Sequence, residues 1–306
     1  MLEGLFKGML NISLYASVVA VVIMLIKMMC GRRLSPDFHY GIWSLFLLKL
    51  VLPLDIKSVF SIFTLFERVA GEPVTERIDA VLPPIDAGAL AQPAGLPSPG
   101  LADGLPVASP GPDLWSAAAI LWLAGVAVML AALVFSYLKT GRTIRASASG
   151  PDRRLAGILS TCRGELDIRR DVPVCTSGLF DIPFIFGFAR PMIVLPGRIC
   201  SGLPDEGLKA VLAHELMHIR RKDHLVNLVL FLVKSVHWFN PVVWLACRWM
   251  KNDGERACDS AVINGYSAER RGEYARALVE VAAVVGKRAP VPAVSAFTEG
   301  DFKGRV

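Results

Sequence analysis

Three long apolar stretches dominate the first half of the chain, at residues 8–26, 39–54 and 114–138. The first has nineteen residues without a formal charge, about 28 Å of helix, which matches a bilayer core of about 30 Å. The third has twenty-five uncharged residues. The second is interrupted only by a few polar side chains, and Lys49 near its end can extend to the membrane interface. We therefore predict three membrane spans, at about 8–26, 39–54 and 114–138.

The segment between the second and third stretches has a different composition. Residues 81–112 contain eight prolines and five glycines, a composition typical of a flexible linker. Residues 67–113 carry a net charge of −5, whereas basic side chains follow the first and third stretches. Because positive charge beside membrane helices favours the cytoplasm, we expect the N-terminus and the 55–113 loop outside the cell membrane. A cleaved signal peptide is disfavoured, because its basic residues would precede the apolar run.

The second half of the chain mixes strand and helix patterns. Residues 164–171 alternate in polarity, and 172–175 and 192–195 are short β-rich runs, so we predict strands of a small sheet there. Residues 203–219 predict a helix, because apolar positions recur at helical spacing. The apolar segment 225–250 is interpreted as a buried core hairpin, alone or mixed with the alternatives, which are a pair of helices that dips into the membrane and a fourth membrane span; Lys234, His237 and Asn240 interrupt the segment and favour the hairpin. Within it, Asn240-Pro241 is a typical start for a helix that we expect to run past residue 259.

The overall composition indicates a membrane protein. The 306 residues are 53% hydrophobic and 20% charged, and the mean hydropathy is +0.48, which excludes a chain that is disordered throughout. The net charge of +6 comes from basic residues beside apolar stretches, so we expect no direct nucleic-acid binding. The six cysteines lie far apart without a C-x-x-C pair, which argues against a disulfide framework.

The predicted helix at 203–219 carries an H-E-x-x-H motif, His214 to His218. Histidines four residues apart project from the same helix face, so both imidazoles can bind one zinc ion. The intervening Glu215 can then take a proton from water, which makes it the candidate catalytic base of peptide hydrolysis.

A catalytic zinc site needs a third protein ligand and leaves its fourth position to water. Glu255 is our candidate, and Asp259, one turn later, can accept a hydrogen bond from a ligand imidazole. Cys258 could instead complete a closed, inert site. His224 is a weaker ligand candidate, because it lies about 240° around the helix from His218.

Other polar residues have less specific interpretations. His224, His237 and Arg256 are candidates to stabilise a developing oxyanion, and the sequence does not separate them. Asp253 precedes Glu255 by two residues, and we expect it to be a cap, a salt-bridge partner or a group behind the ligands.

These residues resemble the integral membrane zinc peptidases of the beta-lactam and methicillin-resistance signal transducers, often called antirepressor peptidases. The resemblance covers most of the chain and rests on six blocks: G-I-W-S-L-F-L-L-K-L-V-L-P at 41–53, P-F-I-F-G-F-A-R-P-M-I-V-L-P at 183–196, H-E-L-M-H-I-R-R-K-D at 214–223, F-N-P-V-V-W at 239–244, D-G-E-R-A-C-D at 253–259 and A-F-x-E-x-x-x-K-x-R at 296–305. It implies Zn²⁺ ligands at His214, His218 and Glu255, with Glu215 as catalytic base. It also implies that 183–196 forms a sheet edge on which an extended substrate could pair.

The resemblance implies an α+β membrane protein. Its membrane domain would occupy residues 1–138, and a cytoplasmic zinc-peptidase domain with a small sheet would occupy 139–306. The implied partners are the lipid bilayer and a protein substrate, such as a transcriptional repressor or the chain itself. Many family members add a final span and an extracellular penicillin-binding sensor domain. The sequence ends at Val306 without either, so we do not carry over a beta-lactam ligand.

Two other functions stay open at this point. In one, the protein is a non-catalytic membrane transducer whose helices are held together by zinc. In the other, it is a quality-control protease for membrane proteins, which would share the chemistry and differ in substrate. Self-cleavage would fit the family, and three dibasic pairs are candidate sites, although such pairs are usually solvated charge: Arg220-Arg221, Arg270-Arg271 and Lys287-Arg288.

Overall fold

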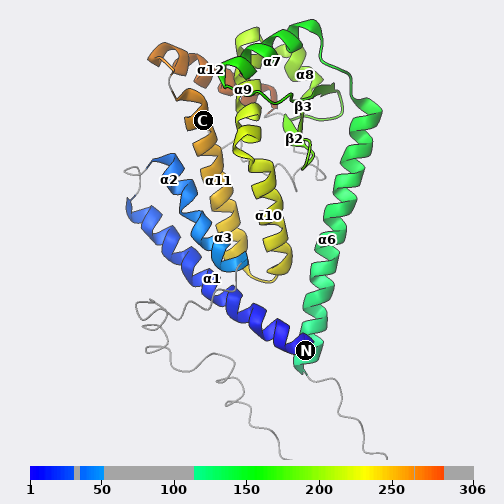
Figure 1. The fold of residues 1–306 in the computed structure, drawn as a ribbon, viewed down its shortest axis with the longest axis vertical. Helices are drawn as coiled ribbons and strands as arrows, with labels where there is room; N and C mark the ends of the chain where they lie inside the picture. The colour runs from blue at the N-terminus through cyan, green and yellow to red at the C-terminus, as the bar shows by residue number, and fades with distance from the viewer. Residues whose placement is uncertain (31–34, 52–113, 265, 286–306) are drawn as a thin grey trace, which may run out of the picture.

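The computed structural model describes residues 1–30, 35–51, 114–264 and 266–285. In these ranges the protein is mostly helical, with a small sheet at one end (Figure 1). The linker at 81–112, the remainder of the 55–113 loop, the pair at 287–288 and the block at 296–305 lie outside the described residues.

The elements follow one another in this order: α1 (Leu2–Cys30), α2 (Pro36–Gly41), α3 (Trp43–Val51), α6 (Leu114–Ser147), α7 (Arg153–Glu165), β1 (Val174–Ser177), β2 (Phe184–Phe186), β3 (Met192–Pro196), α8 (Gly197–Gly202), α9 (Asp205–Arg221), α10 (Asp223–Val236), α11 (Pro241–Ile263) and α12 (Ala268–Val285).

Among the described residues, α1 and α6 are the two helices long and apolar enough to cross a membrane. They contain the predicted spans 8–26 and 114–138, and both continue further. The second predicted span is different, because a single residue, Ile42, separates the short helices α2 and α3. Gly41 stands at this break, where its lack of a side chain weakens the helix. The last three residues of that span lie outside the described residues.

The apolar segment 225–250 lies in a helical hairpin of α10 and α11, and this hairpin packs against the N-terminal helices (Figure 1). They share one buried cluster, which includes Ala16, Ala20 and Ile23 of α1, Trp43 and Phe46 of α3, Leu230 and Val233 of α10, and Val243, Ala246 and Met250 of α11. At the tip of the hairpin, the Asn240 amide donates to the hydroxyls of Ser13 and Ser17, at 2.7 and 2.8 Å. The hairpin therefore packs beside a candidate membrane helix.

α6 also contacts the tip of the hairpin. The indole N–H of Trp122 donates to the carbonyl of Val236, and that of Trp238 donates to the carbonyl of Trp122. A Cβ at Gly125 would lie 2.3 Å from the Trp238 ring nitrogen, so glycine is needed for this close approach.

The sheet has the order β1-β3-β2, with β1 parallel and β2 antiparallel to β3. The predicted runs 172–175 and 192–195 are confirmed as strands, with β1 shifted by two residues. The strand expected at 164–171 is wrong. Asp152 caps the start of α7, which runs to Glu165, and the chain then turns through Asp167 at φ 48°. The buried residues at 155, 159 and 162 recur at helical spacing, and the helix that they define extends into the start of the alternating segment 164–171.

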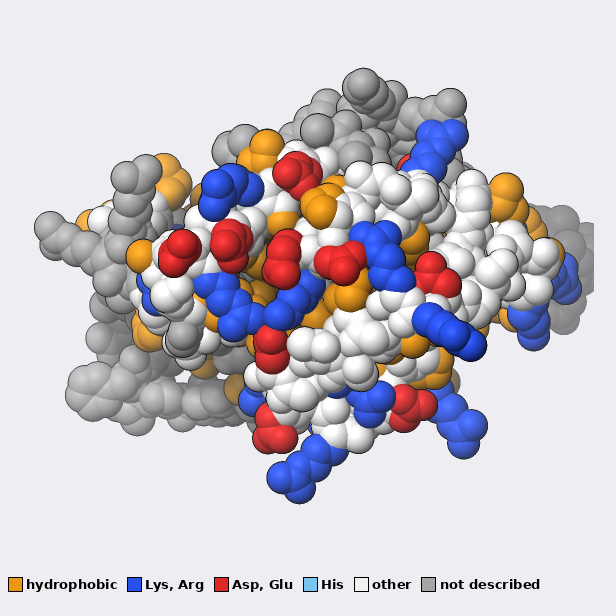
Figure 2. All heavy atoms as spheres, turned by 90° about the horizontal axis from the view of Figure 1, so that it is seen from above, with side chains coloured by type: hydrophobic (Ala, Val, Ile, Leu, Met, Phe, Trp, Pro, Cys, Tyr) orange, Lys and Arg blue, Asp and Glu red, His pale blue; other side chains and the backbone are white. Residues whose placement is uncertain are grey.

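The sheet end of the molecule carries the second large core, built around α9 by α7, β1, β3, α8 and α12. Figure 2 views this end from above and shows Lys and Arg interspersed with Asp and Glu. Ion pairs there include Arg154–Asp205 and Lys209–Glu165. A mixed charged surface of this kind is typical of an aqueous face, in contrast to the exposed apolar side chains of α1 and α6.

Candidate metal centre

The H-E-x-x-H motif lies in the C-terminal half of α9, which is deeply packed. Leu208, Leu212 and Leu216 point into the core with 1% or less of their surface exposed. This packing fixes the rotation of the helix and also buries His214 and Glu215, which are 5% and 9% exposed. The motif is therefore held on a rigid element, as a preorganised site requires.

Three donor atoms from α9 and α11 come together. Nε2 of His214 lies 3.0 Å from Nε2 of His218, and Oε2 of Glu255 lies 3.6 Å from each of these nitrogens. Donor atoms about 2.0–2.2 Å from a tetrahedral zinc ion are roughly 3.3–3.6 Å apart. The two separations from Glu255 lie at the upper end of this range, and the 3.0 Å between the imidazoles is shorter than it. The donor types and their convergence fit a zinc ion bound by two imidazoles and one carboxylate.

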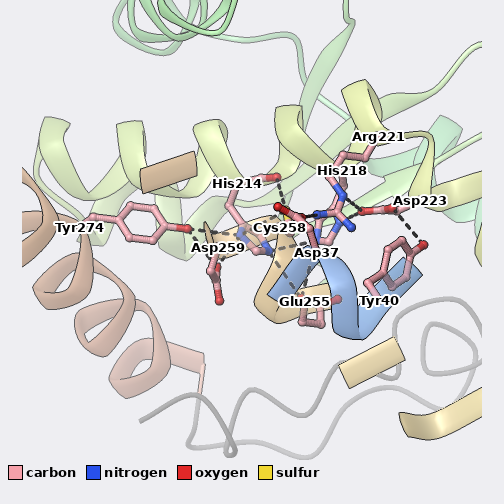
Figure 3. A network of polar contacts seen from close by, with 10 residues as sticks. All are labelled: Asp37, Tyr40, His214, His218, Arg221, Asp223, Glu255, Cys258, Asp259 and Tyr274. Carbon is pink, nitrogen blue, oxygen red and sulfur yellow. Dashed lines mark hydrogen bonds and ion pairs between the residues drawn. The ribbon is translucent and has the colours of Figure 1, made fainter. Parts of the chain in front are cut away.

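The remaining ring nitrogens of both histidines contact carboxylates (Figure 3). Nδ1 of His214 lies 3.0 Å from Oδ1 of Asp259, and Nδ1 of His218 lies 2.7 Å from Oδ2 of Asp223. Tyr274 donates its hydroxyl to Asp259 at 3.1 Å and also lies 3.3 Å from Nδ1 of His214. A carboxylate at Nδ1 holds the proton there and leaves Nε2 as the ligand atom.

Cys258 is a second candidate ligand beside the histidines. His214, His218 and Cys258 offer ligand atoms that all lie within 4.8 Å of one another. The thiol lies 3.8 Å from Nδ1 of His214 and donates to the carbonyl of the same residue at 3.7 Å. Glu255, in contrast, is equidistant from the two Nε2 atoms that face each other, which favours the carboxylate as third ligand.

The electrostatic environment suits a cation. Burial would lower the pKa of His218, but the charge on Cys258 and the hydrogen bond with Asp223 raise it to about 10. Burial likewise opposes the charge of His214, yet Cys258 and Asp259 raise its pKa. The surrounding groups thus stabilise positive charge between the two imidazoles, as they would for a bound metal ion.

The structure also places the candidates for oxyanion stabilisation and Asp253. His237 lies at the far end of α10 from Asp223, about 21 Å along the fourteen-residue helix, so the structure does not bring it to the site. Arg256 follows Glu255 on α11 and is exposed. His224 lies beside the backbone of Phe188, and burial lowers its pKa. Asp253 is a salt-bridge partner, one of the roles expected for it, and its partner is Lys27.

Sequence reasoning missed Asp223, Tyr274 and Tyr40. Asp223 lies within the H-E-L-M-H-I-R-R-K-D block, but its contact depends on Lys222 adopting a left-handed conformation at φ 61°, which turns the chain back toward His218. Tyr274 comes from α12, and the Tyr40 hydroxyl reaches Oδ1 of Asp223 from α2 at 3.5 Å. No local pattern indicates the two tyrosine contacts, because they join segments far apart in the sequence.

A comparison with protein families matches residues 7–306 to a family described as BlaR1 peptidase M56. The chain belongs to the M56 peptidase family. Membership of this family supports the assignment of the chain as a metallopeptidase, and the two long apolar helices fit a membrane protein.

Curated M56-type relatives align with the chain over a shorter range. The regulatory protein BlaR1 of Bacillus licheniformis is 35% identical over 178 residues, which are 58% of this chain and 30% of the relative. The methicillin resistance mecR1 protein of Staphylococcus aureus (strain Mu50 / ATCC 700699) is 25% identical over 164 residues, 53% of this chain and 27% of the relative. The aligned region thus spans less than a third of the length of either relative.

Proposed function

We propose that the protein is a membrane-embedded zinc endopeptidase whose metal ligands are His214, His218 and Glu255. The observation that carries this proposal is the spacing of 3.0, 3.6 and 3.6 Å among their three donor atoms. When bound, zinc would supply Lewis acidity that activates water and polarises a peptide carbonyl.

The chain's own residues supply the proton transfers. Glu215 takes a proton from the attacking water and returns it to the leaving amine. Asp223 and Asp259 hold the two imidazoles in one tautomer and one orientation. Of the 183–196 block, β2 is an edge strand of the described sheet and contacts α9, whereas β3 is the central strand. An extended substrate peptide could therefore pair with β2.

We further propose that the membrane domain, residues 1–138, is multi-pass and places the peptidase domain, 139–306, in the cytoplasm. α1 and α6 begin at the same end of the molecule, where Phe6 and Trp122 pack at 5.8 Å, and the sheet lies at the other end (Figure 1). This arrangement supports an external N-terminus and an external 55–113 loop. The hairpin tip contacts Trp122, about 12 Å from the start of α6, so the hairpin would enter the membrane without crossing it.

The proposed substrate is a cytoplasmic regulatory protein, such as a transcriptional repressor, together with the chain itself. The names of the two relatives, which concern regulation and methicillin resistance, support a regulatory role. The competing function, a transducer in which zinc only holds helices together, would require a closed coordination shell, and the nearby Cys258 is the group that could close it.

Replacement of Glu215 tests the proposal. We expect Glu215→Gln to retain zinc and to lose cleavage of a co-expressed candidate repressor by at least 10²-fold, as expected for loss of a general base. Glu206→Gln, an exposed carboxylate in the first turn of the same helix, is the control. Zinc binding with undiminished proteolysis in the Glu215 variant would refute the catalytic role, and preserved signalling without proteolysis would favour the transducer.

A further inference from the structure

One buried carboxylate joins the N-terminal helices to the helix that carries Glu255. Asp253 of α11 forms an ion pair with Lys27 of α1, and its Oδ2 accepts the indole N–H of Trp43 of α3 at 2.7 Å. The side chains of Lys27 and Asp253 are 7% and 6% exposed. A buried ion pair is costly unless its geometry is well satisfied, and it restricts how the elements around it can move.

The cation of this pair is confined as well. Nζ of Lys27 lies 5.2 Å from the ring centre of Trp43 and 5.8 Å from that of Trp249. Cation–π attraction from two indole rings adds to the ion pair and disfavours other positions of the ammonium group. The C-terminal end of α1 is therefore held against α11 at one position along the α11 axis.

The position of Asp253 on α11 makes this attachment relevant to the metal centre. Asp253 and Glu255 are two residues apart, which places them about 200° apart around the helix and about 3 Å apart along it. Asp253 contacts α1 and α3, while Glu255 faces the histidines of α9. α11 is thus held on nearly opposite faces, and a shift at Asp253 displaces Glu255.

Gly254, between these two residues, allows α2 to pack closely against α11. A Cβ there would lie 3.0 Å from the ring of Tyr40. The hydroxyl of Tyr40 in turn contacts Asp223, the carboxylate behind His218. Arg221, the last residue of α9, lies over the same tyrosine ring at 4.9 Å, so α2 contacts both helices that carry the three metal-site donors (Figure 3).

We propose that Asp253 is a positioning residue. Through its contacts with α1 and α3, it determines where Glu255 lies relative to His214 and His218. This inference rests on the proposed metal site and adds a route of regulation to it. Movement of the N-terminal helices would change the metal centre through the Lys27–Asp253 pair.

The test compares zinc affinity in the full-length protein in detergent or nanodiscs. We expect Lys27→Met and Asp253→Asn to weaken zinc affinity about tenfold, measured by competition with a chelator. Because the two groups act as a pair, the double variant should lose no more than either single variant. Lys7→Met is the control, since Lys7 lies on the same helix over Trp115, at 4.6 Å from its ring centre.

A second measurement separates positioning from stability. With Co²⁺ in place of zinc, the visible absorption reports the ligand geometry, and we expect it to change in the Lys27 and Asp253 variants but not in the Lys7 control. Folded variants with wild-type affinity and an unchanged cobalt spectrum would overturn the positioning role. Failure of the wild-type protein to bind zinc or cobalt would instead overturn the proposed function.

Discussion

Asp223 places its carboxylate 2.7 Å from Nδ1 of His218, although it belongs to the next helix. α9 ends at Arg221, and the left-handed conformation of Lys222 reverses the chain so that the first residue of α10 faces the last turn of α9. Arg221, at 3.4 Å, and Tyr40 also contact this carboxylate and hold its orientation. Asp223 therefore fixes the ring that presents Nε2 to the metal centre.

We predict that Asp223→Ala weakens zinc affinity about 10–100-fold, the usual cost of losing a carboxylate behind a ligand imidazole. The reason is that His218 loses the group that holds its tautomer and ring orientation. Chelator competition measures the change. Asp37→Ala is a matched control, because Asp37 is exposed and its ion pair with Arg221 is long, at 4.0 Å. Equal affinities of the two variants would show that Asp223 does not orient His218.

The parts of the protein that depend on local patterns could be predicted from the sequence. The length of an apolar run determines whether a helix can span a bilayer, so the stretches at 8–26 and 114–138 were recognisable as α1 and α6. The i, i+4 spacing of His214 and His218 depends only on helix geometry. The small sheet was also predictable at 172–175 and 192–195, which are short runs with β-branched residues.

The remaining features depend on contacts between distant segments. The Tyr40–Asp223 contact joins residues 183 positions apart, and the Trp43–Asp253 bond joins residues 210 positions apart. Charge and hydropathy along the chain do not encode such pairs, because each residue alone has an ordinary local interpretation. The division of the second apolar stretch at Ile42 was missed for a different reason, because hydropathy alone does not register a local break between two helices.

The choice between Glu255 and Cys258 as third ligand has a direct test. We predict that Glu255→Gln weakens zinc affinity by at least 10²-fold, because an amide oxygen replaces a charged ligand at 3.6 Å from both imidazoles. Cys258→Ser should change the affinity by less than about tenfold, since the thiol contacts the Nδ1 side of His214. Metal content after dialysis against a chelator measures both.

If the Cys258 substitution weakened zinc affinity more than the Glu255 substitution, the metal site would have different ligands. If Cys258→Ser removed the metal and Glu255→Gln retained it, zinc would be bound by two histidines and a thiolate, and Glu255 would lose its assigned role. Loss of metal in both variants would indicate the closed four-ligand site, which leaves no position for water and excludes the hydrolytic mechanism.

The stability of the peptidase end should depend on pH through Glu165. This carboxylate of α7 accepts hydrogen bonds from Lys209 of α9 at 2.7 Å and from Arg270 of α12 at 2.6 Å. Burial would raise the pKa of Glu165, but the two cations outweigh it and hold the pKa below the usual 4.5. The ionised group therefore stabilises the fold at neutral pH, and this contribution is lost as the pH falls below about 4.5 through the lowered pKa.

We predict that Glu165→Gln lowers stability by roughly 1 kcal/mol at pH 7 and low salt, because the pairs are partly exposed and screened by water. The difference from wild type should shrink between pH 7 and pH 3, because falling pH protonates Glu165 through its lowered pKa, and in 1 M salt, where the Debye length is about 3 Å. Thermal unfolding at both pH values measures it, with Glu269→Gln, an exposed carboxylate on α12, as the control. A Glu165→Gln deficit that persists unchanged at pH 3 would assign the effect to packing, and the bridge between α7, α9 and α12 would not be electrostatic.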